Sequence, residues 1–278
     1  MTPELRETLL AGLASGNIVP YLGPGVLADV RNAATGDPMP ATSDALILAM
    51  NNGRPMAPKL MYEFPRAAMN VELKRGRNAV NRFLTQTYGE TAWSRSATHD
   101  WLQQLAPRYV IDINRDTQLQ DSYAGVPHNL VVGVARIGGT PFRYKLYHWD
   151  GGAYTEVESF DMSLPILFKP MGTPRPEANY IASDADYVDY ITELMGGFAI
   201  PPQLKTLREG RRYLTIGLRL NRDTERMVLS DMVYAAANPV GWALIPEPTA
   251  KERRYCAKLG IELVEADIAD LIGVTEPA

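Results

Sequence analysis

The sequence predicts an α/β fold built on a parallel sheet with helices on both faces. Strand-like apolar runs alternate with segments that have the periodicity of amphipathic helices, which is typical of parallel strands joined by right-handed helical crossovers. A glycine-rich turn directly follows the first of these runs, as at the ligand-binding strand ends of many α/β sheets. The expected core strands are 17–22, 108–113, 164–169, 212–217, 241–245 and 261–264.

A helical segment interrupts this alternation early in the chain. Ser43–Met50 has the pattern of a short buried helix, and 57–89 that of two helical pieces broken near Pro65 and Gly76. Because no strand pattern falls between these pieces, we predict that residues 36–95 form a helical insert in the sheet protein.

The sequence changes character between residues 128 and 160. β-rich runs separated by Gly-Gly pairs follow one another there without a helical pattern between them, which favours an antiparallel meander. We therefore predict a β-meander insert at 120–160. Beyond it, we expect helices at 222–235 and 249–258.

Length, charge and cysteine content limit the classes of protein to which this chain can belong. The length of 278 residues suits a single α/β domain over 1–278 with a substantial core. The net charge of −4 lacks the basic footprint of a nucleic-acid or acidic-membrane partner, and no apolar run approaches the roughly 18 residues of a membrane span. The single cysteine, Cys256, excludes an intramolecular disulfide and a cysteine-based zinc site. The first residues lack the apolar core of a signal peptide, so we expect a cytoplasmic protein.

Polar residues and glycines follow the expected core strands. Because the carboxyl ends of parallel strands meet at one edge of a sheet, these loops can line a single crevice. In the first loop, Gly23 and Gly25 permit a tight turn and a close approach of a ligand to the backbone. The candidate ligand-binding residues are Gly23, Pro24, Gly25, Val26, Asn114, Asp116, Met171, Gly172, Gly217, Asn221 and Asp223.

The order and spacing of these motifs resemble the zinc-less sirtuin-like proteins of bacteria. The resemblance covers Val19–Val26, His99–Asp116, Phe168–Gly172, Tyr180–Tyr187, Leu214–Asp223 and Gly260–Val264. It implies a Rossmann-like fold that holds NAD or a related nucleotide, without zinc, at the strand ends. The predicted helical and β inserts lie outside the resemblance.

Several departures from the family pattern bear on activity. The family's phosphate-binding turn is usually Gly-Ala-Gly followed by a hydroxyl residue, whereas here Pro24 removes a backbone N–H and no hydroxyl follows. Asp112-Ile113 takes the position of the family's Thr-Thr pair, and Arg115 that of an aromatic or aliphatic residue. Met171 takes the position of the catalytic His. A thioether does not accept a proton at neutral pH, so we expect the family's cleavage chemistry to be lost or rerouted.

The remaining polar candidates each allow two interpretations. Asn114 can orient a ribose or a water, or hold its loop through backbone hydrogen bonds. Asp116 and Asp223 can bind sugar hydroxyls or cap the helices that follow. His99 has the position of a packed or capping histidine. Three arginines near the strand ends can pair with phosphates or remain solvated; they are Arg115, Arg219 and Arg222.

Three functional hypotheses follow. The preferred one is a nucleotide-binding pseudoenzyme that takes NAD or ADP-ribose, has no deacylase activity and little or no NAD cleavage, and serves as a sensor or an assembly component. An active NAD hydrolase or transferase that uses Asn114 and Asp116 is the first alternative. Structural reuse of the fold is the second. A protein partner or a homo-oligomer is compatible with each of them.

Overall fold

The computed structural model describes residues 1–273, and its architecture confirms the predicted α/β class. A sheet of nine strands has the order β11-β10-β9-β1-β2-β6-β3-β4-β5, and a two-stranded ribbon pairs β7 with β8. The strands are β1 (Ile18–Leu22), β2 (Tyr109–Asp112), β3 (His128–Gly133), β4 (Tyr144–Trp149), β5 (Tyr154–Glu156), β6 (Ile166–Lys169), β7 (Gly172–Thr173), β8 (Asn179–Tyr180), β9 (Arg212–Ile216), β10 (Gly241–Leu244) and β11 (Ile261–Val264).

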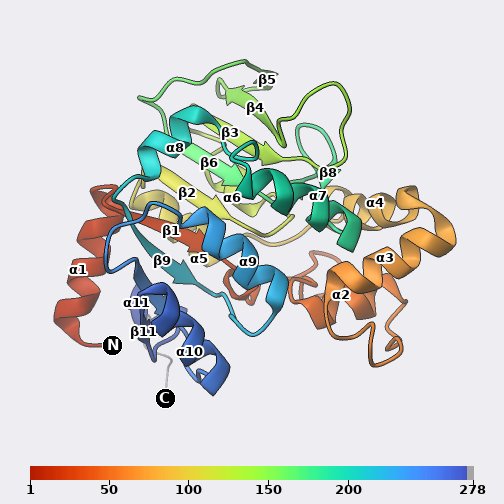
Figure 1. Ribbon diagram of the computed structural model, residues 1–278, viewed down its shortest axis with the longest axis horizontal. Helices are drawn as coiled ribbons and strands as arrows, with labels where there is room; N and C mark the ends of the chain where they lie inside the picture. Colours follow the sequence, from red (N-terminus) through yellow and green to blue (C-terminus); the bar gives the residue numbers. More distant parts are fainter. Residues whose placement is uncertain (274–278) are drawn as a thin grey trace.

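Helices flank the sheet, with the N-terminal helix at one end and a helical group at the other (Figure 1). They are α1 (Pro3–Ala14), α2 (Ser43–Met50), α3 (Phe64–Arg75), α4 (Arg77–Thr85), α5 (Ala97–Gln104), α6 (Gln118–Ser122), α7 (Asp184–Met195), α8 (Pro202–Arg208), α9 (Asp223–Met232), α10 (Ala250–Leu259) and α11 (Ile268–Ile272). A 3₁₀ turn, η1 (Pro24–Leu27), follows β1, and a π-helical turn, η2 (Gln86–Glu90), follows α4. None of the helices within residues 1–273 is long and apolar enough to cross a membrane.

Alternating side chains of the strands enter two separate apolar clusters, one on each face of the sheet. On one face, Leu22 and Leu214 pack with residues of α1, α5 and α11. On the other, Tyr21 and Tyr213 pack with residues of α7, α8, α9 and α10. Strands covered on both faces read as continuous apolar runs, which is why the core strands are recognisable in the sequence.

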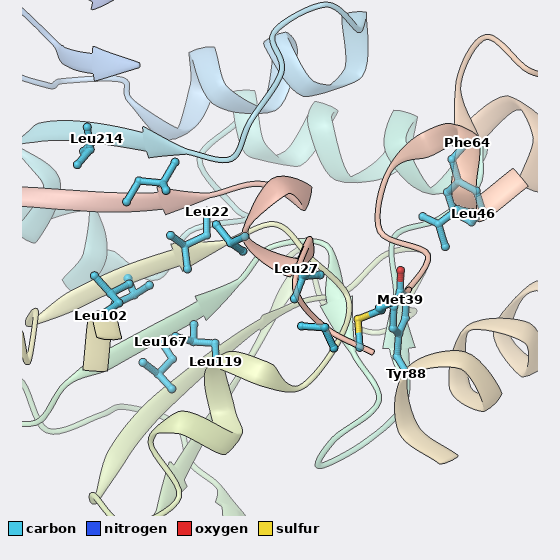
Figure 2. Close-up of a cluster of buried hydrophobic side chains, with 14 of the residues drawn as sticks. Leu22, Leu27, Met39, Leu46, Phe64, Tyr88, Leu102, Leu119, Leu167 and Leu214 are labelled. Atoms are coloured by element: carbon cyan, nitrogen blue, oxygen red, sulfur yellow. The ribbon is translucent and has the colours of Figure 1, made fainter. Parts of the chain in front are cut away.

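The helical group α2–α4 packs on the first of these clusters. Leu46 and Phe64 of this group belong to the same buried cluster as Leu27, Met39 and Leu22 (Figure 2). Pro65 occupies the first turn of α3, where its missing N–H costs no helical hydrogen bond, so it begins a helix instead of breaking one. The break predicted near Gly76 is present, between α3 and α4.

The segment predicted as a β-meander is arranged differently in one respect. β3 pairs in parallel with β6, with Val131 opposite Phe168, and only its other edge pairs antiparallel with β4. It is therefore an interior strand of the main sheet, and all six of its residues are buried. The continuous run Leu-Val-Val, typical of a buried parallel strand, was the signal for this placement. β4 and β5 extend the sheet as an antiparallel edge.

The side of the sheet to which successive strands are added changes between β1 and β9. From β1 the sheet grows through β2 and β6 on one side, whereas β9, β10 and β11 add to the other side. β1 is parallel to both neighbours, with Leu22 opposite Asp112 of β2 and Ile216 of β9. In open α/β sheets such a switch point opens a crevice outside the carboxyl ends of the strands.

Candidate functional site

A groove of about 500 Å³ lies at this switch point, at the carboxyl ends of β1, β9 and β10. We call it the outer groove. Among the sequence-predicted residues it contains Pro24, Gly25, Gly217 and Asn221. Asp267 and Ala269, at the start of α11, form part of its opposite wall. A volume of this size is in the range of small-molecule sites.

A second, smaller cavity of about 60 Å³ adjoins the outer groove. We call it the inner cavity. It is lined by the predicted residues Asn114 and Met171, and by Arg115. The two spaces share wall residues, which are Pro24, Ser43, Arg222 and Glu225. A ligand in the outer groove can therefore extend a small group toward the inner cavity.

The glycine turn after β1 has its backbone N–H groups already engaged. The N–H of Gly23 donates to the carbonyl of Ile216 at 2.9 Å, and that of Gly25 to the carbonyl of Gly217 at 2.7 Å. The N–H of Val26 donates to the carbonyl of Gly23 at 3.2 Å, and Pro24 has none. In this conformation residues 23–26 offer a phosphate no free N–H group. The turn still lines the outer groove, through Pro24 and Gly25.

The glycines allow a close contact between the backbones of the loops after β1 and β9. A Cβ atom on Gly25 would lie 2.8 Å from the Cα atom of Gly217, and one on Gly23 would lie 2.7 Å from that of Leu218. Gly217 itself has φ +66°, and a Cβ on it would lie 2.6 Å from the nitrogen of Val26. The loops after β1 and β9 can therefore touch only as glycine backbones.

Asn114 is fixed by hydrogen bonds that set the orientation of its amide. Its Nδ2 donates to the carbonyl of Gly23 at 3.0 Å and to Oδ1 of Asp112 at 2.8 Å. Its backbone N–H also donates to Oδ1 of Asp112, at 3.0 Å. Both predicted roles are thus compatible, because Nδ2 holds the loop while the amide oxygen makes no hydrogen bond within residues 1–273 and can accept one from a ligand.

Asp112 in turn belongs to a buried polar network beneath the site. Its Oδ2 accepts from Nζ of Lys169 at 2.7 Å and lies 3.4 Å from Nε2 of His99, and none of the three side chains is exposed. Burial alone would raise the pKa of Asp112, but the charge of Lys169 and the contact with His99 hold it well below its usual range. His99 is thus a packed residue, whose Nδ1 lies 2.8 Å from the hydroxyl of Ser96.

The other predicted residues lie outside both cavities. Asp116 is buried and accepts from the N–H of Gln118 at 2.7 Å, which is a local turn interaction. Gly172 has φ +87° in the β7–β8 ribbon. Asp223 is exposed at the start of α9, where it pairs with Arg226. Gly23 and Val26 contribute to the turn but not to either lining.

Two charged residues of the inner cavity stand out by their burial. Arg115 is only 8% exposed, and Glu225 has one carboxylate oxygen, Oε2, that is inaccessible to solvent and has no hydrogen-bond partner within the described residues. Burial raises the pKa of the Glu225 carboxyl to about 7, and nearby Arg222 opposes the rise. No signal in the sequence pointed to Glu225, because α9 meets the cavity only through the tertiary fold. The sequence did contain a signal for Lys169 and Asp112, because each is a charged residue at the end of an apolar strand.

No group of three or more His, Cys, Asp or Glu side chains within residues 1–273 is arranged to hold a metal ion.

We expect Gly217→Ala to lower the free energy of unfolding by about 2 kcal/mol or more, because it adds a methyl group between the two loops at a left-handed φ. Gly210→Ala is the matched control, with the same φ of +66° and no atom within 4 Å of the added Cβ. Urea denaturation of both variants measures the contact. Equal losses would show that only backbone strain matters at Gly217.

We expect Lys169→Met to cost about 3–5 kcal/mol of unfolding free energy, because it leaves the buried Asp112 carboxylate without its cation. Lys145→Met is the matched control: Lys145 pairs with Glu177 at 2.6 Å on the surface, and such pairs contribute less than about 1 kcal/mol. Both are measured by chemical denaturation at neutral pH. Adding Asp112→Asn should restore part of the loss, and a small loss in the single variant would contradict the role of the pair.

Comparison with known proteins gives one match. Residues 144–264, from β4 to β11, match the family model described as a SIR2-like domain. The matched segment includes Met171, Gly172 and the loop after β9, but not the glycine turn or Asn114. No curated protein matches the chain. The match covers less than half of the chain and supports a sirtuin-like family.

Proposed function

We propose that this protein binds NAD, ADP-ribose or a related nucleotide in the outer groove, with little or no cleavage of NAD. The observation that carries the proposal is the position of the groove, between Gly25 and Gly217 at the topological switch point of the sheet. Nucleotides bind at this point in doubly wound folds. The SIR2-like match supports the same class of ligand.

The charges in the groove fit this proposal. Since the glycine turn has no free N–H group at residues 23–26, the phosphates require side-chain donors. Arg222 lines both cavities, and its only carboxylate contact within residues 1–273 is a long one of 3.4 Å to the exposed Asp44. Arg219 is committed to Glu252, with 2.9 Å from Nε to Oε1. Arg222 is therefore the cation that we assign to the phosphates.

The lining of the inner cavity supports binding of the nucleotide without turnover. Met171 lines it where the family resemblance expects the catalytic His, and a thioether supplies no general base. Asp116, the acid of the hydrolase alternative, lies outside the lining. A protein that holds a nucleotide without consuming it suits a sensor or an assembly component.

We expect NAD and ADP-ribose to raise the melting temperature of the protein, and Ala269→Trp to abolish the effect by filling the outer groove. A ligand at a hundredfold excess over its dissociation constant stabilises the fold by about 2.7 kcal/mol. Ala257→Trp, on the exposed face of α10, is the matched control and should keep the shift. Thermal denaturation with and without ligand measures it. No shift for the natural protein at millimolar ligand would contradict the proposal.

We expect the natural protein to release nicotinamide from NAD no faster than its Asn114→Ala variant, because residue 171 offers no proton acceptor. Chromatography after long incubation measures the release, with an active NAD glycohydrolase as the positive control of the assay. Positioned base catalysis contributes roughly 10²–10⁴-fold, so a retained activity would be visible. Release that depends on Asn114 would overturn the proposal of binding without turnover.

A further inference from the structure

Arg115 is a buried cation of the inner cavity. Its side chain lines the inner cavity, and no carboxylate within residues 1–273 lies within 4.0 Å of its guanidinium. Buried charges in proteins are ordinarily paired, because an unpaired ion loses its hydration without compensation. An arginine in this setting indicates that an anion completes the site.

The guanidinium is held so that one edge remains available. Nε and Nη2 donate to the carbonyl of Ile181 at 2.9 and 2.6 Å, and Nη2 also donates to the hydroxyl of Tyr187 at 3.1 Å. Phe64 packs on the planar face, with its ring centroid 5.3 Å from Cζ. Nη1 has no acceptor within the described residues. Its two N–H groups are therefore free to donate to an oxygen anion.

The carboxyl groups nearby do not fill this role. Glu63 lines the inner cavity, but its Oε1 accepts from the backbone N–H of Asp223 at 2.8 Å. Glu225 shares the lining, and its carboxyl is partly protonated at neutral pH because burial raises its pKa to about 7. Neither makes an ion pair with Arg115. The neutral polar groups available to a ligand are the Asn114 amide oxygen and the hydroxyls of the wall.

We propose that the inner cavity binds an anionic end group, a carboxylate or a phosphate, of the nucleotide held in the outer groove, and that Arg115 determines this specificity. The proposal rests on the proposed function, because the inner cavity adjoins the outer groove and shares Ser43 and Arg222 with its lining. The neutral carboxamide of NAD offers Arg115 no opposite charge. A dinucleotide with a negative distal group is therefore the better ligand.

Two near-isosteric probes test this inference. Nicotinic acid adenine dinucleotide differs from NAD by a carboxylate in place of the carboxamide. By calorimetry we expect the natural protein to bind it roughly tenfold or more tightly than NAD, the size of a charge-assisted hydrogen bond. Arg115→Gln should bring the ratio of the two affinities to about one. Arg115→Lys, which keeps the charge but not the planar fork, should retain part of the preference.

ADP serves as the reference ligand, because its two phosphates correspond to the pyrophosphate of the dinucleotide in the outer groove and it lacks the second ribose and the group beyond it. Its affinity should be unchanged in Arg115→Gln, which also shows that this variant is folded. Arg175→Gln, at an exposed arginine paired with Asp121, is the matched control and should keep the preference. Inorganic phosphate is the free-anion probe, and it should weaken binding of the carboxylate dinucleotide in the natural protein but not in Arg115→Gln.

The outcomes separate the two proposals. If ADP, NAD and the carboxylate dinucleotide bind equally well, the nucleotide site stands and the role of Arg115 is overturned. A preference that persists in Arg115→Gln overturns it as well. Phosphate binding without any preference between the dinucleotides would assign the cavity to a free anion and reject the nucleotide end group. If no nucleotide binds, the proposed function fails and this inference fails with it.

Discussion

The ion pair between Lys169 and Asp112 fixes the geometry on which the candidate site depends. Both residues end strands that lie side by side and in parallel, so the pair joins the carboxyl ends of β2 and β6 at the base of the inner cavity. Lys169 holds the Asp112 charge on Oδ2, which leaves Oδ1 to accept both N–H contacts of Asn114. Because Nδ2 of Asn114 is held by Gly23 and Asp112, its amide oxygen remains available to the inner cavity, which Asn114 lines.

A second constraint is the close contact of the loops after β1 and β9. The contact requires glycine at positions 23, 25 and 217, and it uses the same backbone N–H groups that a phosphate would need. The backbone N–H groups of this turn therefore join the two loops at the switch point and are not available to bind an anion. In the proposed function, negative charge is then recognised by arginine side chains such as Arg222, which lines both the outer groove and the inner cavity.

The sequence was sufficient for the features that depend on local pattern. Buried parallel strands are apolar along their whole length, so the ends of β1, β6 and β9 could be predicted within a few residues. The same pattern also predicted which loops meet at one edge. β-rich runs with no helical pattern between them predict a meander for β3, whereas its parallel partner β6 comes later in the chain. Pairing of strands distant in sequence is set by tertiary packing, which no local pattern encodes.

The same difference between local pattern and tertiary packing decides which candidate residues line the site. Pro24, Gly25, Gly217 and Asn221 line the outer groove because they directly follow strands that end there. Asp116 and Asp223 are also near strand ends, but local turns and helix starts use their carboxylates. Glu225 and the buried state of Arg115 could not be predicted, because both depend on α7, α9 and the α2–α4 group closing around one point.

Met171 and Arg115 alter the inner cavity in compatible ways. A methionine in place of the histidine expected from the resemblance removes a proton acceptor but keeps an apolar wall. Arg115 adds a fixed positive charge to that wall, which attracts an anionic group. Loss of a catalytic base alone would leave a cavity that still suits nicotinamide. In the proposed site the added cation would select an anionic group, so the two residues together favour the proposal of a different ligand over the hypothesis that activity has simply been lost.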